Sequence, residues 1–424
     1  MTRFLYKYFL APLSFFAYLM VSLYLPKARR FFRIRQNMMG KLAKEVPAKD
    51  RFRVMVHVSS VGELLEVRPM LRALRSLDNP PYVVLSYSSP SLTDKLLQDS
   101  ADLVTPSPFD TGVLVKKFLD IVGPDLIVWS SYDIWPALAW EAHDRKIPLL
   151  LVNGRLPSVS GRLRFPARFF FSRLYPVLDE VGAIDRESAE RFPLLGVPSE
   201  NVSITGNCRF DETLARCRAV SSDDPDLAPV PKSEFVLMLG STWLEDHDKL
   251  LPAIGELLSQ HNGFAVVIAP HEPDRKHIAE LENFFASQGV PYEFYKQLRQ
   301  EGKAGQRVVI VNTVGVLYKL YRKAHAAYVG GSFHQGVHNV MEPAGMGLPV
   351  MTGPAHHNSP EAEALVSRGG AFVVNNSADV VERISGWLED PASREQAGQK
   401  ALDMIQQSGG ATARTMDLIS KYFA

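Results

Sequence analysis

The chain has 424 residues, of which 46% are hydrophobic and 22% charged, a composition typical of a folded globular protein with two core domains. Its net charge of +1 lacks the basic excess of a nucleic-acid-binding protein, so we expect no nucleic-acid partner. The two cysteines, Cys208 and Cys217, are too few for a disulfide framework and have no zinc-ligand spacing.

The N-terminus has the character of a membrane segment. Residues 8–25 carry no charge, are rich in Phe, Leu and Tyr, and are just long enough for a tilted span. A basic cluster follows at 27–35, as on the cytoplasmic side of an anionic membrane, and no small-residue cleavage site is present. We therefore expect residues 1–38 to form a membrane anchor. Pro12 leaves an interfacial helix open, and a buried first helix is the alternative.

Short apolar strands alternate with amphipathic helices through residues 39–220. This alternation predicts an α/β domain whose parallel sheet is covered by helices on both faces. The expected strands are 54–58, 82–87, 126–129, 148–152 and 202–205, and the expected helices are 64–74, 92–97, 134–143 and 162–178. The last helix interleaves arginines with phenylalanines, which suits either a membrane-facing patch or a helix with its Phe side chains on the core.

Residues 221–231 interrupt the alternation. Their three prolines and three aspartates predict an interdomain linker, after which a second doubly wound domain covers 232–405. Its expected strands are 235–239, 264–269, 308–311, 326–329 and 371–374, and its expected helices are 247–258, 316–323, 340–346, 379–388 and 393–407, with one more ending near 285. Residues 406–424 are expected to add a C-terminal helix that can pack back on the first domain. Two such domains in tandem predict a ligand cleft at the carboxyl ends of their strands.

The most distinctive stretch of the second domain is 326–354. An apolar strand ends at Gly330 and Gly331, a polar loop follows, and Asn339 is placed to cap a short helix whose first turn contains Glu342. A glycine turn before a helix N-terminus can bind an anion, and Glu342 can accept hydrogen bonds from a ribose. An ordinary capped connection between a strand and a helix explains the same pattern equally well.

In the first domain, the strand at 54–58 leads into Glu63, where a helix should begin. We expect the helix N-terminus to keep this carboxylate ionised, so that it can take a proton from an attacking hydroxyl. The alternative is a plain first-turn glutamate that only complements the helix dipole.

Six segments, in order, carry a resemblance to a known family. They are HVSSVGE (57–63), SSYDIWPAL (130–138), NGRLPSVSGR (153–162), TGNCRFD (205–211), GST (240–242) and VGGSFHQGVHNVMEP (329–343). Together they resemble the 3-deoxy-D-manno-octulosonic acid (Kdo) transferases, glycosyltransferase family 30-like enzymes with the GT-B fold. The resemblance implies transfer of Kdo from CMP-Kdo to a lipid A precursor in lipopolysaccharide biosynthesis. It also implies work at the cytoplasmic face of a bacterial inner membrane, without metal or other cofactor.

The resemblance also implies roles for individual residues. Glu63 would be the catalytic base of an inverting transfer. The implied acceptor-side residues are Ser60, Gly62, Asp133, Arg155 and Ser160. The implied donor-side residues are Ser241, Thr242, His271, Arg275, Gly331, Ser332, His338, Asn339 and Glu342.

Several positions depart from the family pattern, mostly on the donor side. His271 and Glu272 stand where the family has Arg and His, and Asp133 stands where it has Glu. Loss of a guanidinium removes a bidentate anion contact that a histidine replaces only when protonated. A GT-B enzyme that uses another nucleotide-activated sugar, and a catalytically silent membrane-anchored binding protein, therefore stay open as alternatives.

Overall fold

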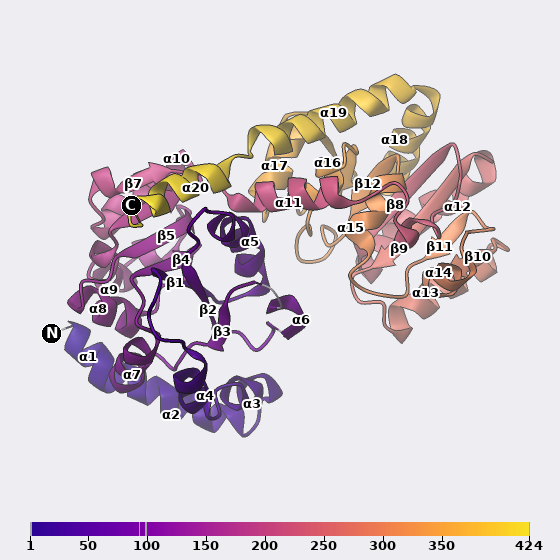
Figure 1. The fold of residues 1–424 in the computed structure, drawn as a ribbon. Coiled ribbons are helices and arrows are strands. Elements are labelled where there is room, and N and C mark those ends of the chain that lie inside the picture. The colour runs from indigo at the N-terminus through magenta and orange to yellow at the C-terminus, as the bar shows by residue number, and fades with distance from the viewer. Residues whose placement is uncertain (1, 93, 98–99, 424) are drawn as a thin grey trace. The chain divides into compact units, whose positions relative to one another are not determined.

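The computed structural model describes residues 2–92, 94–97 and 100–423 and divides the chain into two compact units. The first unit comprises Met1–Glu212 and Gly409–Ala424, and the second comprises Thr213–Ser408. Each contains one seven-stranded sheet in which all pairings are parallel, so the expected α/β class is confirmed. Figure 1 labels the elements of both units.

The sheet of the first unit has the order β3-β2-β1-β4-β5-β6-β7. Its strands are β1 Arg53–Val58, β2 Tyr82–Tyr87, β3 Leu103–Pro106, β4 Leu126–Ser130, β5 Leu149–Gly154, β6 Glu180–Ala183 and β7 Val202–Ile204. Its α-helices are α1 Thr2–Leu5, α2 Ala11–Ser22, α3 Pro26–Arg33, α4 Met38–Glu45, α5 Val61–Arg75, α6 Asp94–Leu97, α7 Gly112–Val122, α8 Pro136–Asp144, α9 Ala167–Phe171, α10 Arg186–Arg191 and α20 Ala411–Ser420. The strands read as apolar runs because helices cover both faces of the sheet, one core including Trp129 and Trp140 and the other Val56 and Leu64.

The sheet of the second unit has the order β10-β11-β9-β8-β12-β13-β14. Its strands are β8 Phe235–Thr242, β9 Phe264–Pro270, β10 Tyr292–Phe294, β11 Val308–Ile310, β12 Ala326–Val329, β13 Val350–Thr352 and β14 Ala371–Val373. Its α-helices are α12 Leu244–Gln260, α13 Arg275–Ser287, α14 Tyr295–Glu301, α15 Leu317–Leu320, α16 Met341–Gly345, α17 Pro360–Ser367, α18 Ser377–Glu389 and α19 Pro391–Gln407. Because each sheet is parallel, all of its strands end at the same edge of that sheet. The predicted site residues lie in the loops that follow these strand ends.

The expected linker at 221–231 is wrong. The chain passes between the units inside α11 Cys208–Ala219 and returns at Gly409, and residues 221–231 lie wholly in the second unit. Leu227 and Val230 are buried there, and Lys319 forms ion pairs of 2.9 and 2.6 Å with Asp224 and Asp226. Proline and aspartate favour a turn as well as a linker, and here they form the short 3-10 helix Pro225–Leu227.

The expected helix at 162–178 is also wrong. The segment contains the 3-10 helices Gly161–Leu163 and Tyr175–Val177 around the five-residue α9. Pro166 and Pro176 cause the breaks, because proline has no N–H to donate within a helix. Phe170 and Phe171 pack against the core, whereas Phe165 and Phe169 are 89% and 56% exposed. The core interpretation is therefore confirmed for Phe170 and Phe171, and a membrane-facing patch at Phe165 and Phe169 stays a prediction.

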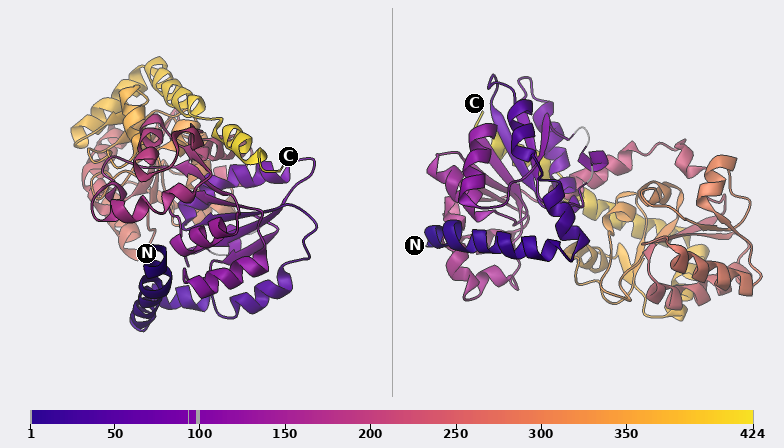
Figure 2. Two further views of the ribbon diagram at one scale, coloured as in Figure 1. Left: turned by 90° about the vertical axis from the view of Figure 1, so that its left-hand side faces the viewer. Right: turned by 90° about the horizontal axis from the view of Figure 1, so that it is seen from below.

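Some elements have no counterpart among the expected ones, chiefly β3, β6, β10, α7 and α10. The expected helix 92–97 is present as α6 Asp94–Leu97, with residue 93 outside the described part of the chain. At the C-terminus, α20 packs on α5, and Ile419 is fully buried in the core beside it. The last helix thus belongs to the first unit, as the two further views also show (Figure 2).

Candidate active site

The first candidate group lies where β1 leads into α5. Ser60 is the N-cap of α5, and its hydroxyl accepts a hydrogen bond of 3.2 Å from the Glu63 amide. In return, the Glu63 carboxylate accepts one of 2.6 Å from the Ser59 amide. The pair resembles a capping box, except that the carboxylate accepts from the amide of Ser59, one residue before the N-cap. It holds the Glu63 side chain in one position, with the residue 9% exposed.

The protonation of Glu63 differs from the expectation. Burial, with the nearby charges of Asp133 and Glu66, raises the pKa of Glu63 to about 8, although the hydrogen bond from Ser59 opposes the shift. The expectation that the helix N-terminus keeps this carboxylate ionised is therefore wrong near neutral pH, because desolvation outweighs the helix dipole. A carboxyl group with a pKa near the working pH can take up and release a proton, as a general base must.

Glu66 is a residue that the sequence analysis missed. It accepts hydrogen bonds of 3.2 and 2.9 Å from the hydroxyls of Ser130 and Ser131 at the end of β4. Burial raises its pKa, and the positive charges of Arg209 and Arg155 oppose that rise. The spacing of three from Glu63 placed both carboxyl groups on one helix face, and that was the available signal.

The five predicted acceptor-side residues all follow β1, β4 or β5, at the carboxyl edge of the first sheet. The Ser60 and Ser160 hydroxyls cap helical turns, while Asp133 and Arg155 lie close enough to act on the carboxyl groups of Glu63 and Glu66, respectively. Gly62 is the member of this group with free space for a side chain. A Cβ atom there would meet only the Ser60 hydroxyl, at an ordinary 3.7 Å. The fold itself therefore does not require glycine at 62.

The second candidate group lies at the carboxyl end of β8 in the second unit. A bulge between Gly240 and Thr242 puts Ser241 at a φ of 54°, a strained conformation for a residue with a side chain. The buried Thr242 hydroxyl is hydrogen-bonded to His247 at 2.8 Å, so it is already engaged within the protein. Of the two predicted donor-side residues in the GST motif, Ser241 is half-exposed and Thr242 is buried.

Asp246, also missed from the sequence, ties this turn to the glycine loop after β12. Its buried carboxylate accepts hydrogen bonds from the Tyr328 hydroxyl at 2.7 Å and from the Gly331 and Trp243 amides at 2.8 Å. The Gly331 amide is thus engaged within the protein rather than directed at a ligand. A Cβ at Gly330 would lie 2.3 Å from the Ser241 carbonyl oxygen, so the close approach of two backbones explains that glycine.

Trp243 and three histidines form a stacked cluster beside this loop. The rings of His271 and His338 are parallel, with centroids 4.2 Å apart, and the Trp243 ring stacks on His271 at 4.9 Å. His334 lies against Trp243 and is 3.1 Å from the Glu245 carboxylate. Burial first, and the neighbouring His271 second, lower the pKa of His338. The predicted His271 and His338 are therefore brought together, and Trp243 is the member that sequence reasoning did not include.

The connection after β12 differs in part from the expectation. The Asn339 side chain accepts a 3.2 Å hydrogen bond from the Met341 amide, but α16 has only five residues and Val340 is its N-cap. So short a helix has little dipole to offer an anion. Glu342 accepts a 2.9 Å hydrogen bond from Arg216, an ion pair that any ribose contact would have to share.

Two predicted donor residues remain. The buried Ser332 hydroxyl accepts hydrogen bonds of 3.0 and 2.6 Å from Thr352 and the Gly353 amide, which joins the loop to the end of β13. Arg275 is exposed at the first residue of α13, where its guanidinium can reach an anion in solution.

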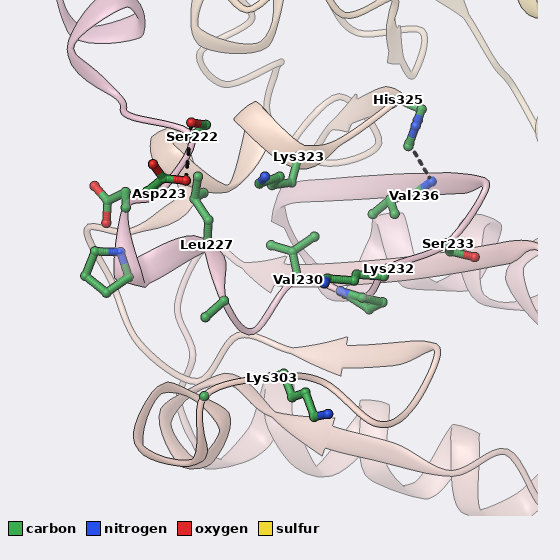
Figure 3. Close-up of a pocket in the computed structure, with 15 residues that line it drawn as sticks. Ser222, Asp223, Leu227, Val230, Lys232, Ser233, Val236, Lys303, Lys323 and His325 are labelled. Atoms are coloured by element: carbon green, nitrogen blue, oxygen red, sulfur yellow. Dashed lines mark hydrogen bonds between the residues drawn. The ribbon is translucent and has the colours of Figure 1, made fainter.

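A pocket of about 630 Å³ lies elsewhere in the second unit, near the amino ends of β8 and β12 (Figure 3). Val236, His325 and the side chains of Lys232, Lys303 and Lys323 line it. The predicted donor residues follow the opposite, carboxyl ends of these strands, so this pocket is not the candidate site.

Within residues 2–92, 94–97 and 100–423, no group of three or more His, Cys, Asp or Glu side chains is arranged to hold a metal ion. The expectation of transfer without a metal or other cofactor stays a prediction.

Comparison with known proteins gives one family for the sequence. The profile described as 3-deoxy-D-manno-octulosonic-acid transferase (kdotransferase) matches residues 28–212. The Haemophilus influenzae protein named 3-deoxy-D-manno-octulosonic acid transferase is 25% identical over 385 residues, or 87% of each chain. The Chlamydophila psittaci protein of the same name is 28% identical over 375 residues, or 86% of this chain and 84% of that one.

Solved structures agree on the fold. UDP-GlcNAc 2-epimerase from Neisseria meningitidis has a TM-score of 0.62 at 15% identity and covers 88% of this chain and 99% of its own. A glycosyltransferase from Rickettsia africae has a TM-score of 0.55 at 12% identity, covering 88% and 98%. These similarities show a GT-B-like architecture and nothing finer. The chain therefore resembles the 3-deoxy-D-manno-octulosonic acid transferases, through the profile match at residues 28–212 and through relatives of one name that align over most of its length.

Proposed function

We propose that this protein is an inverting glycosyltransferase that moves Kdo from CMP-Kdo to a lipid A precursor in lipopolysaccharide biosynthesis. The observation that carries the proposal is Glu63 at the carboxyl edge of the first sheet. Hydrogen bonds with Ser59 and Ser60 hold this residue, and its pKa is about 8. The similarity of the chain to proteins named 3-deoxy-D-manno-octulosonic acid transferase supports the donor and acceptor classes.

In this reaction the ionised Glu63 carboxylate takes the proton of an acceptor hydroxyl. The freed oxygen forms a bond to the anomeric carbon of Kdo, the bond from that carbon to the CMP phosphate oxygen breaks, and CMP leaves with the electron pair. Attack from the face opposite the leaving group inverts the anomeric centre. Glu66 accepts hydrogen bonds from Ser130 and Ser131 through one carboxylate oxygen, and we assign it no proton transfer.

On the donor side, we assign anion binding to His271, His338 and Arg275, and ribose binding to Glu342. We assign phosphate binding to Ser241, whose side chain is half-exposed, rather than to the buried Thr242. Thr242, Gly331 and Ser332 act by shaping the turns, because their polar groups are engaged within the protein. Neutral and protonated histidines can together replace a missing arginine only in part.

For the membrane, we propose attachment at the cytoplasmic face of the inner membrane through the N-terminal segment. Among the residues that the structure describes, the helix Thr2–Ser22 is long and apolar enough to cross a membrane, which supports attachment through this segment. An acceptor that carries acyl chains requires an enzyme that works at the bilayer surface.

The test is a mass-spectrometric assay of the purified protein with a lipid A precursor and CMP-Kdo, run beside a UDP-sugar. Glu63→Gln should abolish transfer and leave CMP-Kdo binding in place, because only the proton acceptor is removed. Glu187→Gln, at an exposed first-turn glutamate of α10, is the matched control and should transfer normally. Turnover by Glu63→Gln would refute the base assignment, and turnover with the UDP-sugar alone would refute the donor.

A further inference from the structure

The N-terminal helical segment packs along its whole length on the first unit. It comprises α1, the π-helix Tyr6–Leu10 and α2. The side chains that contact the rest of the unit recur every three or four positions, apart from the adjacent Tyr6 and Lys7, and so form one stripe on the helix. Its members are Arg3, Tyr6, Lys7, Ala11, Phe15, Tyr18 and Ser22.

Polar contacts fasten the beginning of the segment. Arg3 forms a 3.0 Å ion pair with Asp144, and Lys7 forms one of 3.2 Å with Glu141 on the same helix, α8. The Tyr6 hydroxyl donates to Asp110 at 3.0 Å, and its ring lies edge-on to Trp140. Arg3, Tyr6 and Lys7 thus make polar contacts within five residues. A helix inside the hydrocarbon core would rarely carry so many polar side chains, because burying each one in lipid is costly.

Apolar contacts fasten the rest. Phe15 packs edge-on against Phe109 at 4.9 Å, in the segment before α7. Tyr18 packs edge-on against Phe31 of α3. The Arg29 guanidinium donates a hydrogen bond of 3.0 Å to the Leu23 carbonyl oxygen. These contacts hold α3 beside α2. Figures 1 and 2 show α1, α2 and α3 together along one side of the first unit, near α4 and α7.

The opposite face of the segment is apolar and exposed. Phe9, Leu13, Phe16, Met20 and Tyr24 are 59%, 67%, 61%, 59% and 80% exposed. Immediately afterwards, α3 carries the exposed cations Lys27, Arg30 and Arg33. An apolar face bordered by cations is complementary to the acyl region and the anionic headgroups of one membrane leaflet.

The length of the docked stripe separates two geometries. From Arg3 to Ser22 a helix rises about 28 Å, close to the ~30 Å hydrocarbon core. A helix that crossed the bilayer would therefore draw Asp110, Glu141 and Asp144 into the hydrocarbon with it. A helix that lies flat leaves these groups on the protein side and buries only its exposed face.

We propose that residues 2–33 form a monotopic membrane-binding surface, with the helix in the plane of the interface and its docked stripe kept against the first unit. The occupant of the exposed face is one leaflet of a bilayer that contains anionic lipid. The inference rests on the membrane attachment proposed above and specifies its geometry.

The test uses thiol accessibility in vesicles, because a flat helix keeps both of its ends on one side. Single cysteines are introduced as Thr2→Cys, Lys27→Cys and, as the reference for the globular unit, Glu200→Cys. The native Cys208 and Cys217 are buried, so the unmodified chain measures their background. A membrane-impermeant maleimide should label all three thiols in inside-out vesicles and none in right-side-out vesicles.

Labelling of Thr2→Cys only in right-side-out vesicles would show a spanning helix and overturn the proposal, as would protection from both sides until detergent is added. Absence of all variants from the membrane fraction would overturn the attachment itself. None of these readouts depends on turnover, so failure of the Kdo transfer assay is a separate result.

Discussion

The indole Nε1–H of Trp243 donates a 2.7 Å hydrogen bond to Nε2 of His338. An indole can only donate, so Nε2 of His338 must accept, and the proton of the neutral imidazole must lie on Nδ1. The parallel His271 ring covers the same imidazole at 4.2 Å. Trp243 therefore selects the tautomer of His338 and leaves Nδ1–H as the group that can donate to a donor phosphate or carboxylate.

We predict that Trp243→Phe weakens CMP-Kdo binding about fivefold, because a phenyl ring can stack on His271 but cannot donate to His338. The ¹⁵N chemical shifts of His338 should change towards a mixture of tautomers. Unchanged tautomer populations in the variant would contradict the assignment even if affinity falls. The kinetic signature is a raised KM for CMP-Kdo with a smaller change in kcat.

We predict that transfer rises with pH up to about 8 and then levels off, because Glu63 must lose its proton and its pKa is about 8. Near pH 7 roughly a tenth of the enzyme has this carboxyl ionised. The measurement is kcat/KM against pH, and a plateau already reached at pH 6 would contradict the raised pKa.

The same shift predicts a pH-dependent stability difference. The folded pKa of Glu63 is raised above its unfolded value, so its contribution to stability is fully present below about pH 4.5 and is lost as the pH rises through about 8. The glutamine of Glu63→Gln has no proton to lose. The melting temperature of this variant, relative to that of the wild type, should therefore rise between pH 5 and pH 9. A constant difference over this range would contradict the prediction.

We predict that Gly62→Ala stabilises the fold by about 0.5–1 kcal/mol and lowers transfer, since helical glycine is unfavourable and the position is sterically open. Loss of activity would then arise from a methyl group that meets the acceptor. Gly40→Ala in α4, where a Cβ meets nothing within 4 Å, is the matched control and should stabilise without loss of activity. Urea denaturation and steady-state kinetics measure the two effects, and a destabilised but active Gly62→Ala protein would contradict both.

We predict that the double charge reversal Arg164→Glu, Arg168→Glu weakens binding to vesicles that contain phosphatidylglycerol. Both arginines are exposed beside Phe165 and Phe169, and α9 contacts the N-terminal segment through Phe170 and Tyr6. Each cation near an anionic surface contributes about 1 kcal/mol, so at least a tenfold loss is expected. The double reversal Arg186→Glu, Arg218→Glu, at two exposed arginines outside this segment, changes the net charge by the same amount. Equal binding by the two double variants would remove α9 from the membrane surface.

Local patterns in the sequence were sufficient for most of the fold. The strands β1, β2, β4, β5, β8, β9 and β12 were predicted because each is an apolar run long enough to be buried on both faces. The short strands β3, β6 and β10 were missed, since each has a Thr, Pro, Glu or Gly within its three or four residues and so gives no clear apolar run. Prolines 166 and 176 should have divided the helix at 162–178, but the regular spacing of Arg and Phe suggested a continuous one.

The sequence by itself determined the two α/β sheets, the resemblance to the Kdo transferases and the motif residues at the strand ends, because apolar periodicity and motif spacing are properties of neighbouring residues. Only the tertiary structure decided the protonation of Glu63, the pairing of Glu342 with Arg216, the bond from Trp243 to His338 and the return of α20 to the first unit. Each of these depends on desolvation or contact between residues far apart in the chain, and no local pattern carries that information.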